Sequence, residues 1–267
     1  MKMKMKMKNI LVKSKLLRLL FFPILRKLDF EILWKHDITK RPVSLLTWLH
    51  KGYWYYGLDR EFDEVERFRE LINDGDCVLE VGGHIGYVTQ IFEDLVGSSG
   101  IVYVAEPTPF SRYFLAKNVS SNTTILPIAL SDVSGNMDFY IEEFGGFTNS
   151  LVSEFTETSS KWLKASQNKS VTEVKKIKVD VNTIDLVSKR EGITPNFIKI
   201  DVEGAELSVL KGAEKTLLSV DALMVEISQD HEEIYELLYK KKFKAKKKNG
   251  NLLASHEHTG GNIFFYR

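Results

Sequence analysis

The chain has few cysteines and no long apolar run, and these absences narrow the possibilities at once. Cys77 is the one cysteine in 267 residues, so an intrachain disulfide is impossible and a reducing compartment is expected. The G-x-S-x-G turn of serine hydrolases and the phosphate-binding loop of nucleotide hydrolases are both missing. The chain therefore lacks the signatures of two large enzyme classes and of a disulfide-stabilised domain.

Basic and acidic residues are almost equal in number but unevenly placed. There are 37 Lys and Arg against 36 Asp and Glu, a formal net charge of +1. Residues 1–28 contain nine basic residues and no acid, and residues 240–248 contain seven lysines. The rest of the chain has 21 basic and 36 acidic residues. A nucleic-acid partner is not expected, because a phosphate backbone needs a broad basic face.

The basic N-terminus, MKMKMKMKNILVKSKLLRLLFFPILRKL, only partly fits a signal peptide. Arg18 and Pro23 interrupt its apolar middle, no small-residue cleavage site follows, and the apolar run is well short of the roughly 20 residues of a spanning helix. It is either a basic amphipathic segment on an anionic membrane surface or a loosely packed tail. We expect a cytoplasmic protein, with peripheral membrane contact through this segment as the open alternative.

Apolar periodicity indicates an N-terminal extension, residues 1–50, and one domain, residues 51–267. In the domain, short apolar runs alternate with helical patterns, which is typical of a parallel sheet with helices on both faces. The last two strands, near 242–247 and at 262–266, are too close for a helical crossover and should pair antiparallel. The expected fold is α/β, a Rossmann-like, mostly parallel sheet with an antiparallel last strand. Further strands are expected at 77–81, 101–105, 124–128, 197–200 and 222–227, and helices at 60–72, 85–96, 109–119, 204–218 and 230–240.

Two parts of the chain do not follow this alternation. Residues 29–57 are rich in aromatic side chains and are expected to pack on the domain, or alternatively to form part of a substrate wall. Residues 138–141 and 174–180 alternate apolar and polar side chains, so they could pair as a hairpin. The polar insertion between them, 145–172, has a length that is usually functional or disordered.

The strongest local signal is VLEVGGHIGY at residues 78–87. A strand reaches Glu80, and glycines follow at 82, 83 and 86, at the sheet edge where ligands bind. The G-x-G-x-x-G spacing of a dinucleotide site is not met, and Glu80 would repel a pyrophosphate. S-adenosylmethionine fits better, because Glu80 can attract its ammonium, directly or through water, and the glycines let the backbone approach the ligand.

A second acid supports the same ligand. Glu106 ends the second expected strand, 20 residues after Gly86. A carboxylate there can accept hydrogen bonds from both ribose hydroxyls. A dehydrogenase would also place an acid here, so Glu106 alone does not distinguish S-adenosylmethionine from a dinucleotide. Glu80 and Glu106 together do. The alternative is two solvated acids at strand ends.

The stretch KIDVEGAE at residues 199–206, followed by LSVLKGAEKTL, resembles the hallmark of the FkbM family of methyltransferases. The resemblance runs from about residue 53 to the C-terminus and implies a class I S-adenosylmethionine-dependent methyltransferase. Most members methylate hydroxyl groups of glycans and natural products. Further matching segments are GDCVLEVGGHIGYVTQ, AEP at 105–107, PIALSD at 127–132, GGFTNSL, VNTIDLV at 181–187 and VEIS at 225–228.

The chain departs from the family pattern at two positions of the glycine-rich loop. The family usually has D-x-G-A-N-x-G, where this chain has Glu80 for the aspartate and His84 for the asparagine. Glutamate keeps the charge and reaches further. His84 is either a simple substitution or an added titratable group at the site.

The candidate site combines strand ends with the family pattern. A hydroxyl acceptor benefits from a base that takes its proton. Asp201 is the first choice for base or acceptor-orienting group, followed by Glu203 and then Glu226. The alternative for Asp201 is a helix cap, and at least one of Glu203 and Glu206 is expected to be structural. The expected cofactor contacts are Glu80, Gly82, Gly83, His84, Gly86, Glu106 and Pro107, with Ala129, Ser131 and Asp132 implied by the family pattern to border the adenine.

The leading hypothesis is an S-adenosylmethionine-dependent O-methyltransferase that acts on a sugar hydroxyl of a glycan or glycolipid precursor. The alternatives are a catalytically inactive module of the same fold and, less in keeping with the glycine spacing, a nicotinamide-dependent oxidoreductase. No metal site is expected, because His256-Glu257-His258 lacks a third ligand and fits a solvated loop better. The N-P-P-[YF] pattern of enzymes that methylate amino groups of bases is absent. We expect the acceptor to contact residues 145–172 and 48–56, which do not identify it.

Overall fold

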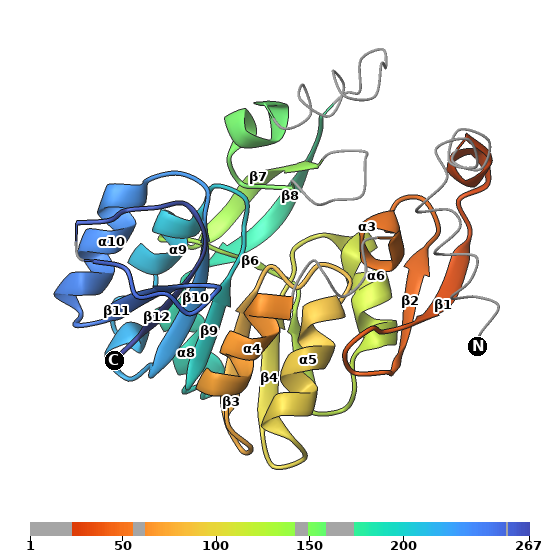
Figure 1. The fold of residues 1–267 in the computed structure, drawn as a ribbon. Helices are drawn as coiled ribbons and strands as arrows, with labels where there is room; N and C mark the ends of the chain where they lie inside the picture. The colour runs from red at the N-terminus through yellow and green to blue at the C-terminus, as the bar shows by residue number, and fades with distance from the viewer. Residues whose placement is uncertain (1–22, 56–61, 142–148, 159–173, 255) are drawn as a thin grey trace. The chain divides into compact units, whose positions relative to one another are not determined.

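The computed structural model describes residues 23–55, 62–141, 149–158, 174–254 and 256–267 (Figure 1). The chain divides into two compact units, Met1–Phe62 and Asp63–Arg267, a later boundary than the predicted one after residue 50. Most of the basic N-terminal segment and most of the polar insertion lie outside the described residues. Within the described ranges, no helix has both the length and the apolar character that crossing a bilayer requires.

The first unit contains a β-hairpin that the sequence analysis did not predict. Strand β1 (Glu31–Lys35) pairs antiparallel with β2 (Pro42–Leu46), and the short helix α3 (Lys51–Tyr55) follows. The buried indole of Trp54 donates a hydrogen bond to the carbonyl of Thr47 at 2.9 Å. The rings of Trp34 and Trp54 also lie with their centroids 6.2 Å apart, so aromatic side chains of this stretch pack on one another.

The second unit is built on a seven-stranded sheet with the order β11-β12-β10-β9-β3-β4-β5. Neighbouring strands from β10 to β5 run parallel, whereas β12 runs antiparallel to both β10 and β11. This confirms the predicted, mostly parallel sheet with an antiparallel last strand. The strands are β3 (Cys77–Val81), β4 (Ile101–Ala105), β5 (Thr123–Leu126), β9 (Phe197–Ile200), β10 (Ala222–Ile227), β11 (Lys244–Lys247) and β12 (Gly261–Tyr266).

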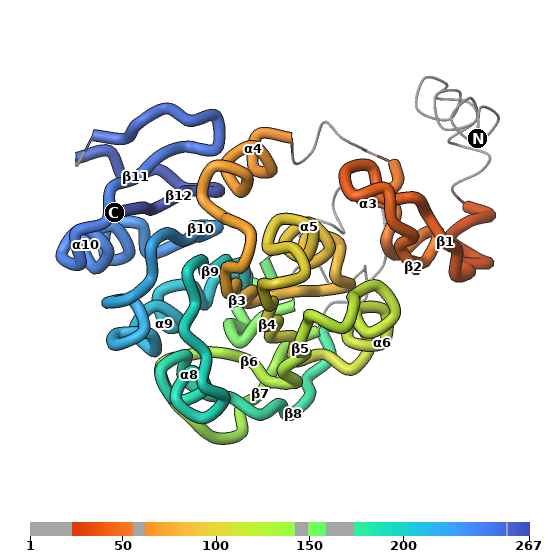
Figure 2. The backbone as a smooth tube through the Cα atoms, turned by 90° about the horizontal axis from the view of Figure 1, so that it is seen from below, coloured from red at the N-terminus to blue at the C-terminus, as the bar shows by residue number. Residues whose placement is uncertain are grey.

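Helices cover both faces of this sheet (Figures 1 and 2). Among the described residues, helices lie on each face of the sheet, so the second unit has the three layers of a doubly wound α/β domain. Helix α8 is an addition to the expected set. The first face carries α4 (Phe62–Leu71), α5 (Tyr87–Val96) and α6 (Pro109–Asn118), and the second carries α8 (Ile184–Glu191), α9 (Glu206–Lys211) and α10 (His231–Lys240).

The face under α4 and α5 changes character along the strands. Phe68 of α4 is the centre of an aromatic cluster, with ring centroids 4.9 Å from Phe92, 5.8 Å from Phe197 and 5.6 Å from Phe264. Side chains alternate between the two faces of a strand, so Lys199 points to the same face as Phe197. This layer is therefore aromatic near the start of β9 and charged near its carboxyl end.

A small second sheet confirms the predicted hairpin. Strands β7 (Gly135–Ile141) and β8 (Lys175–Asn182) pair antiparallel, and β6 (Ala129–Leu130) adds to β8 in parallel. The hairpin strands flank the polar insertion on both sides. The insertion thus leaves and re-enters the domain at adjacent positions.

The prediction of one helix over residues 204–218 is wrong. The segment contains α9 and then a separate 3-10 turn, η2 (Thr216–Leu218). A Cβ at Gly212 would lie 2.0 Å from the carbonyl oxygen of Ser131, so the chain approaches another backbone closely there. The Asp185 carboxylate also accepts a hydrogen bond from the Thr216 amide at 2.7 Å. Tertiary contacts that the local pattern does not contain therefore interrupt the helix.

The aromatic cluster should contribute strongly to stability. Phe68 is 2% exposed, and its replacement by alanine should lower the free energy of unfolding by about 3–5 kcal/mol, because a cavity remains between α4 and the sheet. Phe62 is 58% exposed at the start of α4, so Phe62→Ala is a matched control on the same helix with an expected change within about 0.5 kcal/mol. Urea denaturation of both variants measures the difference, and equal losses would contradict this assignment of the core.

Candidate active site

Two glycines after β3 allow backbones to approach more closely than a side chain would permit. Gly82 has φ +90°, and a Cβ there would lie 1.9 Å from the carbonyl oxygen of Asp201. A Cβ at Gly83 would lie 2.1 Å from the Cγ2 methyl of Val104. The loop between β3 and α5 is therefore held tightly against the ends of both neighbouring strands.

His84 occupies a backbone conformation that few side chains adopt. Its φ is +47°, a region in which asparagine, aspartate and histidine are the most common residues other than glycine. Its amide donates a hydrogen bond to Oε2 of Glu106 at 2.9 Å. Histidine in place of the family's asparagine thus keeps the backbone of the loop, which favours the interpretation of a simple substitution.

Glu106 is buried at the end of β4 and already holds part of the loop. Its Oε1 accepts a hydrogen bond from the Thr108 amide at 2.9 Å and another from the Thr108 hydroxyl. Burial raises the pKa of Glu106, and the hydrogen bonds from Thr108 and His84 oppose this shift. A carboxylate has about four acceptor positions, so these three donors leave room for a ligand hydroxyl.

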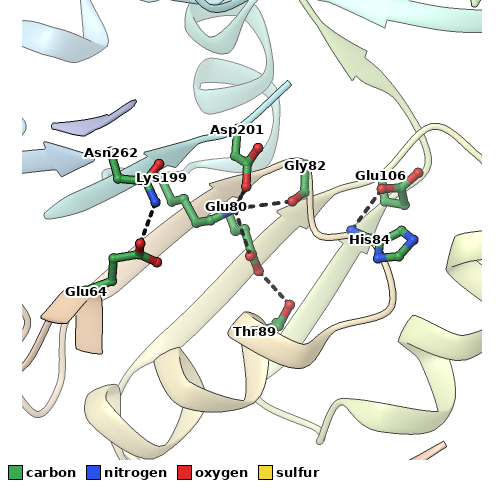
Figure 3. Close-up of polar contacts among 9 residues, drawn as sticks. All are labelled: Glu64, Glu80, Gly82, His84, Thr89, Glu106, Lys199, Asp201 and Asn262. Atoms are coloured by element: carbon green, nitrogen blue, oxygen red, sulfur yellow. Dashed lines mark hydrogen bonds and ion pairs between the residues drawn. The ribbon is translucent and has the colours of Figure 1, made fainter. Parts of the chain in front are cut away.

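Glu80 has a cationic partner inside the protein (Figure 3). It is 1% exposed and lies opposite Lys199 in the register of β3 and β9, with its Oε1 3.6 Å from the ammonium. The hydroxyl of Thr89 donates to Oε2 at 2.5 Å. Burial raises the pKa of Glu80, while Lys199 and Thr89 favour its charged form. In the structure the Lys199 ammonium thus neutralises the charge of Glu80. The predicted attraction between Glu80 and the ammonium of a cofactor stays a prediction.

Lys199 is the residue of the site that sequence reasoning missed. Its side chain is 5% exposed, and its ammonium lies 2.9 Å from Oδ2 of Asp201 and 3.5 Å from the carbonyl oxygen of Gly82. Burial alone would lower the pKa of Lys199, but Asp201 and Glu80 outweigh it and the pKa is raised, so the side chain stays charged. The available signal was a lysine within the short apolar strand FIKI, where a buried cation needs a counter-charge.

The three predicted catalytic acids come together next to Lys199. One carboxylate oxygen from each of Asp201, Glu203 and Glu226 lies within 4.8 Å of the others. Asp201 raises the pKa of Glu226 most strongly, and burial and Glu203 add to the effect. We infer that Glu226 keeps a proton at neutral pH and shares it with Asp201. Asp201 does not cap α9, whose N-cap is Ala205.

The strand register explains this meeting. Val225 of β10 is paired with Ile200 of β9, so Glu226 and Asp201 follow at the same level of the sheet. The spacing of the acids would suit a cation, and the Lys199 ammonium already brings positive charge to them. His258, in the other acid- and histidine-containing segment, stacks on Tyr235 with ring centroids 4.8 Å apart. The expected absence of a metal site stays a prediction.

Residues 80–249 match the family described as the methyltransferase FkbM domain. The chain belongs to the FkbM methyltransferase family. The matched segment extends from the acid of the glycine-rich loop through all three catalytic candidates. The resemblance found in the motifs is thereby confirmed, and the matched segment is a methyltransferase domain.

One curated relative of this FkbM domain carries a substrate in its name. Hexuronic acid methyltransferase AglP of Haloferax volcanii is 31% identical over 170 residues, which is 62% of this chain and 62% of that protein. Two solved structures are similar at low identity. Trm5b of Pyrococcus abyssi has 11% identity and a TM-score of 0.42, covering 88% of this chain and 54% of its own. Precorrin-6y C5,15-methyltransferase of Geobacter metallireducens has 10% identity and a TM-score of 0.41, and the match covers 78% of this chain and 88% of that one.

The loop after β9 of the FkbM domain is held from both sides. Glu203 has φ +55°, and its carbonyl accepts a hydrogen bond from the buried hydroxyl of Ser150 at 2.6 Å. Glu206 is buried and accepts hydrogen bonds from the Gly204 amide at 2.9 Å and the Ser228 hydroxyl at 3.1 Å. Glu206 is thus the structural member of the pair with Glu203, as expected.

The remaining predicted cofactor residues lie further along the chain. Gly86 is the N-cap of α5, and the Pro107 carbonyl accepts a hydrogen bond from the Arg112 guanidinium at 2.6 Å. Ala129 is buried in the small sheet, and Ser131 contacts the exposed Asp132 through its hydroxyl at 3.1 Å. None of the contacts described for these residues joins them to the acid cluster, so their place beside an adenine stays a prediction.

The shared proton of Glu226 should make stability depend on pH. Folding raises the pKa of Glu226. The stabilisation that this residue contributes to the folded state is therefore fully present below its pKa in the unfolded chain, about 4.3, and is lost as pH rises through its pKa in the folded protein. The free energy of unfolding should therefore fall more steeply between pH 5 and pH 8 in the wild type than in Glu226→Gln, which cannot lose a proton. Urea denaturation at several pH values measures this slope.

Glu236→Gln provides the control for that slope. Glu236 is 65% exposed on α10 and pairs with Lys240, so its removal should leave the pH dependence of the wild type unchanged. Parallel curves for the wild type and Glu226→Gln would show that Glu226 binds no extra proton on folding.

Proposed function

We propose that this protein transfers a methyl group from S-adenosylmethionine to a hydroxyl group of a sugar, in a glycan or a glycolipid precursor. The observation that carries the proposal is the acid cluster of Asp201, Glu203 and Glu226, which lies directly beside the glycine-rich loop. A hydroxyl is a weak nucleophile, and a carboxylate placed at the acceptor supplies the base that it needs.

The residues around the glycine-rich loop fit S-adenosylmethionine. Gly82 and Gly83 let the loop pack closely against the ends of β9 and β4, and Glu106 keeps acceptor capacity at the end of β4 for a ribose hydroxyl. When bound, the cofactor supplies a methyl group activated by a positively charged sulfur. The negative cluster also favours a cationic ligand over a pyrophosphate, which argues against a nicotinamide cofactor.

The acids would divide the work between them. Asp201 is the base: as the acceptor oxygen gains the methyl group, the hydroxyl proton passes to Asp201. Glu226 in its protonated form donates a hydrogen bond to Asp201, which helps to hold that carboxylate in place. Glu203 completes the cluster from the loop that Ser150 holds. Because His84 preserves the loop backbone, an active enzyme is favoured over an inactive module.

The charge of the cluster favours a hydroxyl over a carboxylate as the methylated group. A carboxylate acceptor is already ionised, needs no base, and would be repelled by Asp201 and Glu203. The name of the relative AglP supports a sugar acceptor, and a hexuronic acid carries both kinds of group. We therefore expect an ether product. A glycolipid acceptor would agree with peripheral membrane contact through the basic N-terminus, and nucleic acid is still not the expected acceptor.

Loss of the Glu106 charge should weaken cofactor binding. Glu106→Gln removes one acceptor oxygen and the negative charge, so the affinity for S-adenosylmethionine should fall about tenfold to a hundredfold. Isothermal titration with S-adenosylmethionine and S-adenosylhomocysteine measures this change. Glu191→Gln, at an exposed position at the end of α8, is the matched control and should bind as the wild type does. Equal affinities of the two variants would remove Glu106 from the cofactor site.

Replacing the base should abolish transfer without abolishing binding. We expect Asp201→Asn to lower kcat by about 100-fold or more, because asparagine cannot take the hydroxyl proton, while S-adenosylmethionine still binds. The assay follows methyl label from S-adenosylmethionine into neutral hexosides, hexuronic acids and glycolipid fractions. Treatment of the products with mild alkali then separates methyl esters, which are cleaved, from methyl ethers, which are not.

The exposed Asp94 of α5 supplies the control, since Asp94→Asn makes the same chemical change away from the cluster. Alkali-stable label on a sugar, lost in Asp201→Asn and kept in Asp94→Asn, would support the proposal. Alkali-labile label would mean that a carboxylate is methylated. Label in none of the sugar fractions would overturn the choice of acceptor.

A further inference from the structure

We propose that Lys199 is a positioning residue for methyl transfer, whose buried ammonium is held by Glu80 and in turn holds the carboxylate of Asp201 at the acceptor. The inference rests on the proposed function, because it gives Asp201 the role of base. It assigns Glu80 an indirect part as the anchor of Lys199, in place of the contact with the cofactor that its motif suggests.

The ammonium of Lys199 joins three parts of the chain (Figure 3). It lies 2.9 Å from Asp201 Oδ2 after β9, 3.5 Å from the Gly82 carbonyl in the glycine-rich loop, and 3.6 Å from Glu80 Oε1 on β3. Without the ammonium, Glu80 would be a lone charge in the interior and Asp201 would face only other carboxyl groups of the cluster. One cation thus ties the expected cofactor loop to the expected base.

The side chains of Glu80, Lys199 and Asp201 become more exposed in that order. The Glu80 side chain is 1% exposed and that of Lys199 is 5% exposed, whereas that of Asp201 is 31% exposed. Lys199 cannot turn toward water without leaving Glu80 unpaired in the interior, which is strongly unfavourable. Glu80 therefore fixes the lysine, and the lysine fixes Asp201, the more exposed of its two carboxylate partners.

The main chain of Asp201 is fixed at the same place. Its amide donates a hydrogen bond to the carbonyl of Val81 at 3.0 Å, and its carbonyl lies where a Cβ of Gly82 would otherwise be. Backbone and side chain of Asp201 are thus both held by β3 and its loop. A base held in this way keeps a constant distance from a ligand bound at the loop, which is what transfer geometry requires.

The charge of Lys199 also sets the state of the cluster. Three carboxyl groups act on it: Glu80 from β3, Asp201 after β9 and Glu226 from β10. Glu203 lies beside Asp201 and Glu226 in the cluster. A neighbouring cation favours the ionised form of a carboxyl group, which is the form that a base needs. Without the charge of Lys199, the proton shared in the cluster would bind Asp201 more readily, and Asp201 would then be unable to act as a base.

The test compares Lys199→Gln with the double variant Glu80→Gln/Lys199→Gln. The single change leaves Glu80 buried without its cation and can unfold the protein, whereas the double change removes both charges together. In each variant that folds, by circular dichroism and thermal midpoint, we measure kcat, the KM of the acceptor, the affinity for S-adenosylmethionine and the pH dependence of kcat/KM.

We expect kcat to fall by about 100-fold and affinity for S-adenosylmethionine to stay within about threefold of the wild type, a difference of less than about 1 kcal/mol. The acid limb of kcat/KM should move up by about one pH unit, since loss of the cation favours protonated Asp201. If Lys199 had only a structural role, its replacement would leave the acid limb of the pH profile where it is in the wild type. Lys199→Arg keeps the charge, so it should restore the wild-type acid limb and part of kcat.

Thr89→Val is the matched control. It removes the hydroxyl that donates to Glu80 but leaves the Lys199–Asp201 pair in place, so its acid limb should coincide with that of the wild type. A folded double variant with wild-type kcat and an unmoved limb would overturn the role of Lys199 and leave the proposed function intact. A wild-type enzyme that methylates no sugar would instead overturn the proposed function, and this inference with it.

Discussion

A lysine ammonium buried between two carboxylates is the interaction on which the site depends. A charge can leave water only when a counter-charge is close, so Glu80 and Lys199 can be buried together but not one at a time, and Asp201 meets the ammonium from the half-buried side. This requirement couples β3 to β9, and through them the glycine-rich loop to the acid cluster. Burying the ion pair contributes little net stability, so its main effect is to fix the position of the acid cluster relative to the glycine-rich loop.

Close packing around this pair makes the arrangement rigid. The backbones of Gly82 and Asp201 touch, and the aromatic cluster around Phe68 fixes α4 and α5 over the same face of the sheet. The polar layer at the carboxyl ends of the strands thus rests on a dense apolar layer below it. A methyltransferase needs such stiffness, because small displacements between acceptor, base and methyl group cost much of the rate.

Much of the domain could be predicted from local pattern, and the failures have physical causes. Apolar runs located the parallel strands, because buried strands are continuously apolar, and the short final connection required an antiparallel β12. The helix expected over residues 204–218 failed because Gly212 packs against a distant carbonyl and Asp185 binds the following amides. The hairpin of β1 and β2 has no clear local signal, because neither EILWK nor PVSLL alternates apolar and polar side chains.

For the site, the sequence alone determined which acids end which strands, where the glycines lie, and the family to which those motifs belong. Only the tertiary structure decided that Glu80 faces Lys199 and that Asp201, Glu203 and Glu226 share one cluster. These pairings follow from the register between strands that are distant in sequence. Register is set by packing of the whole sheet, and no local pattern contains it.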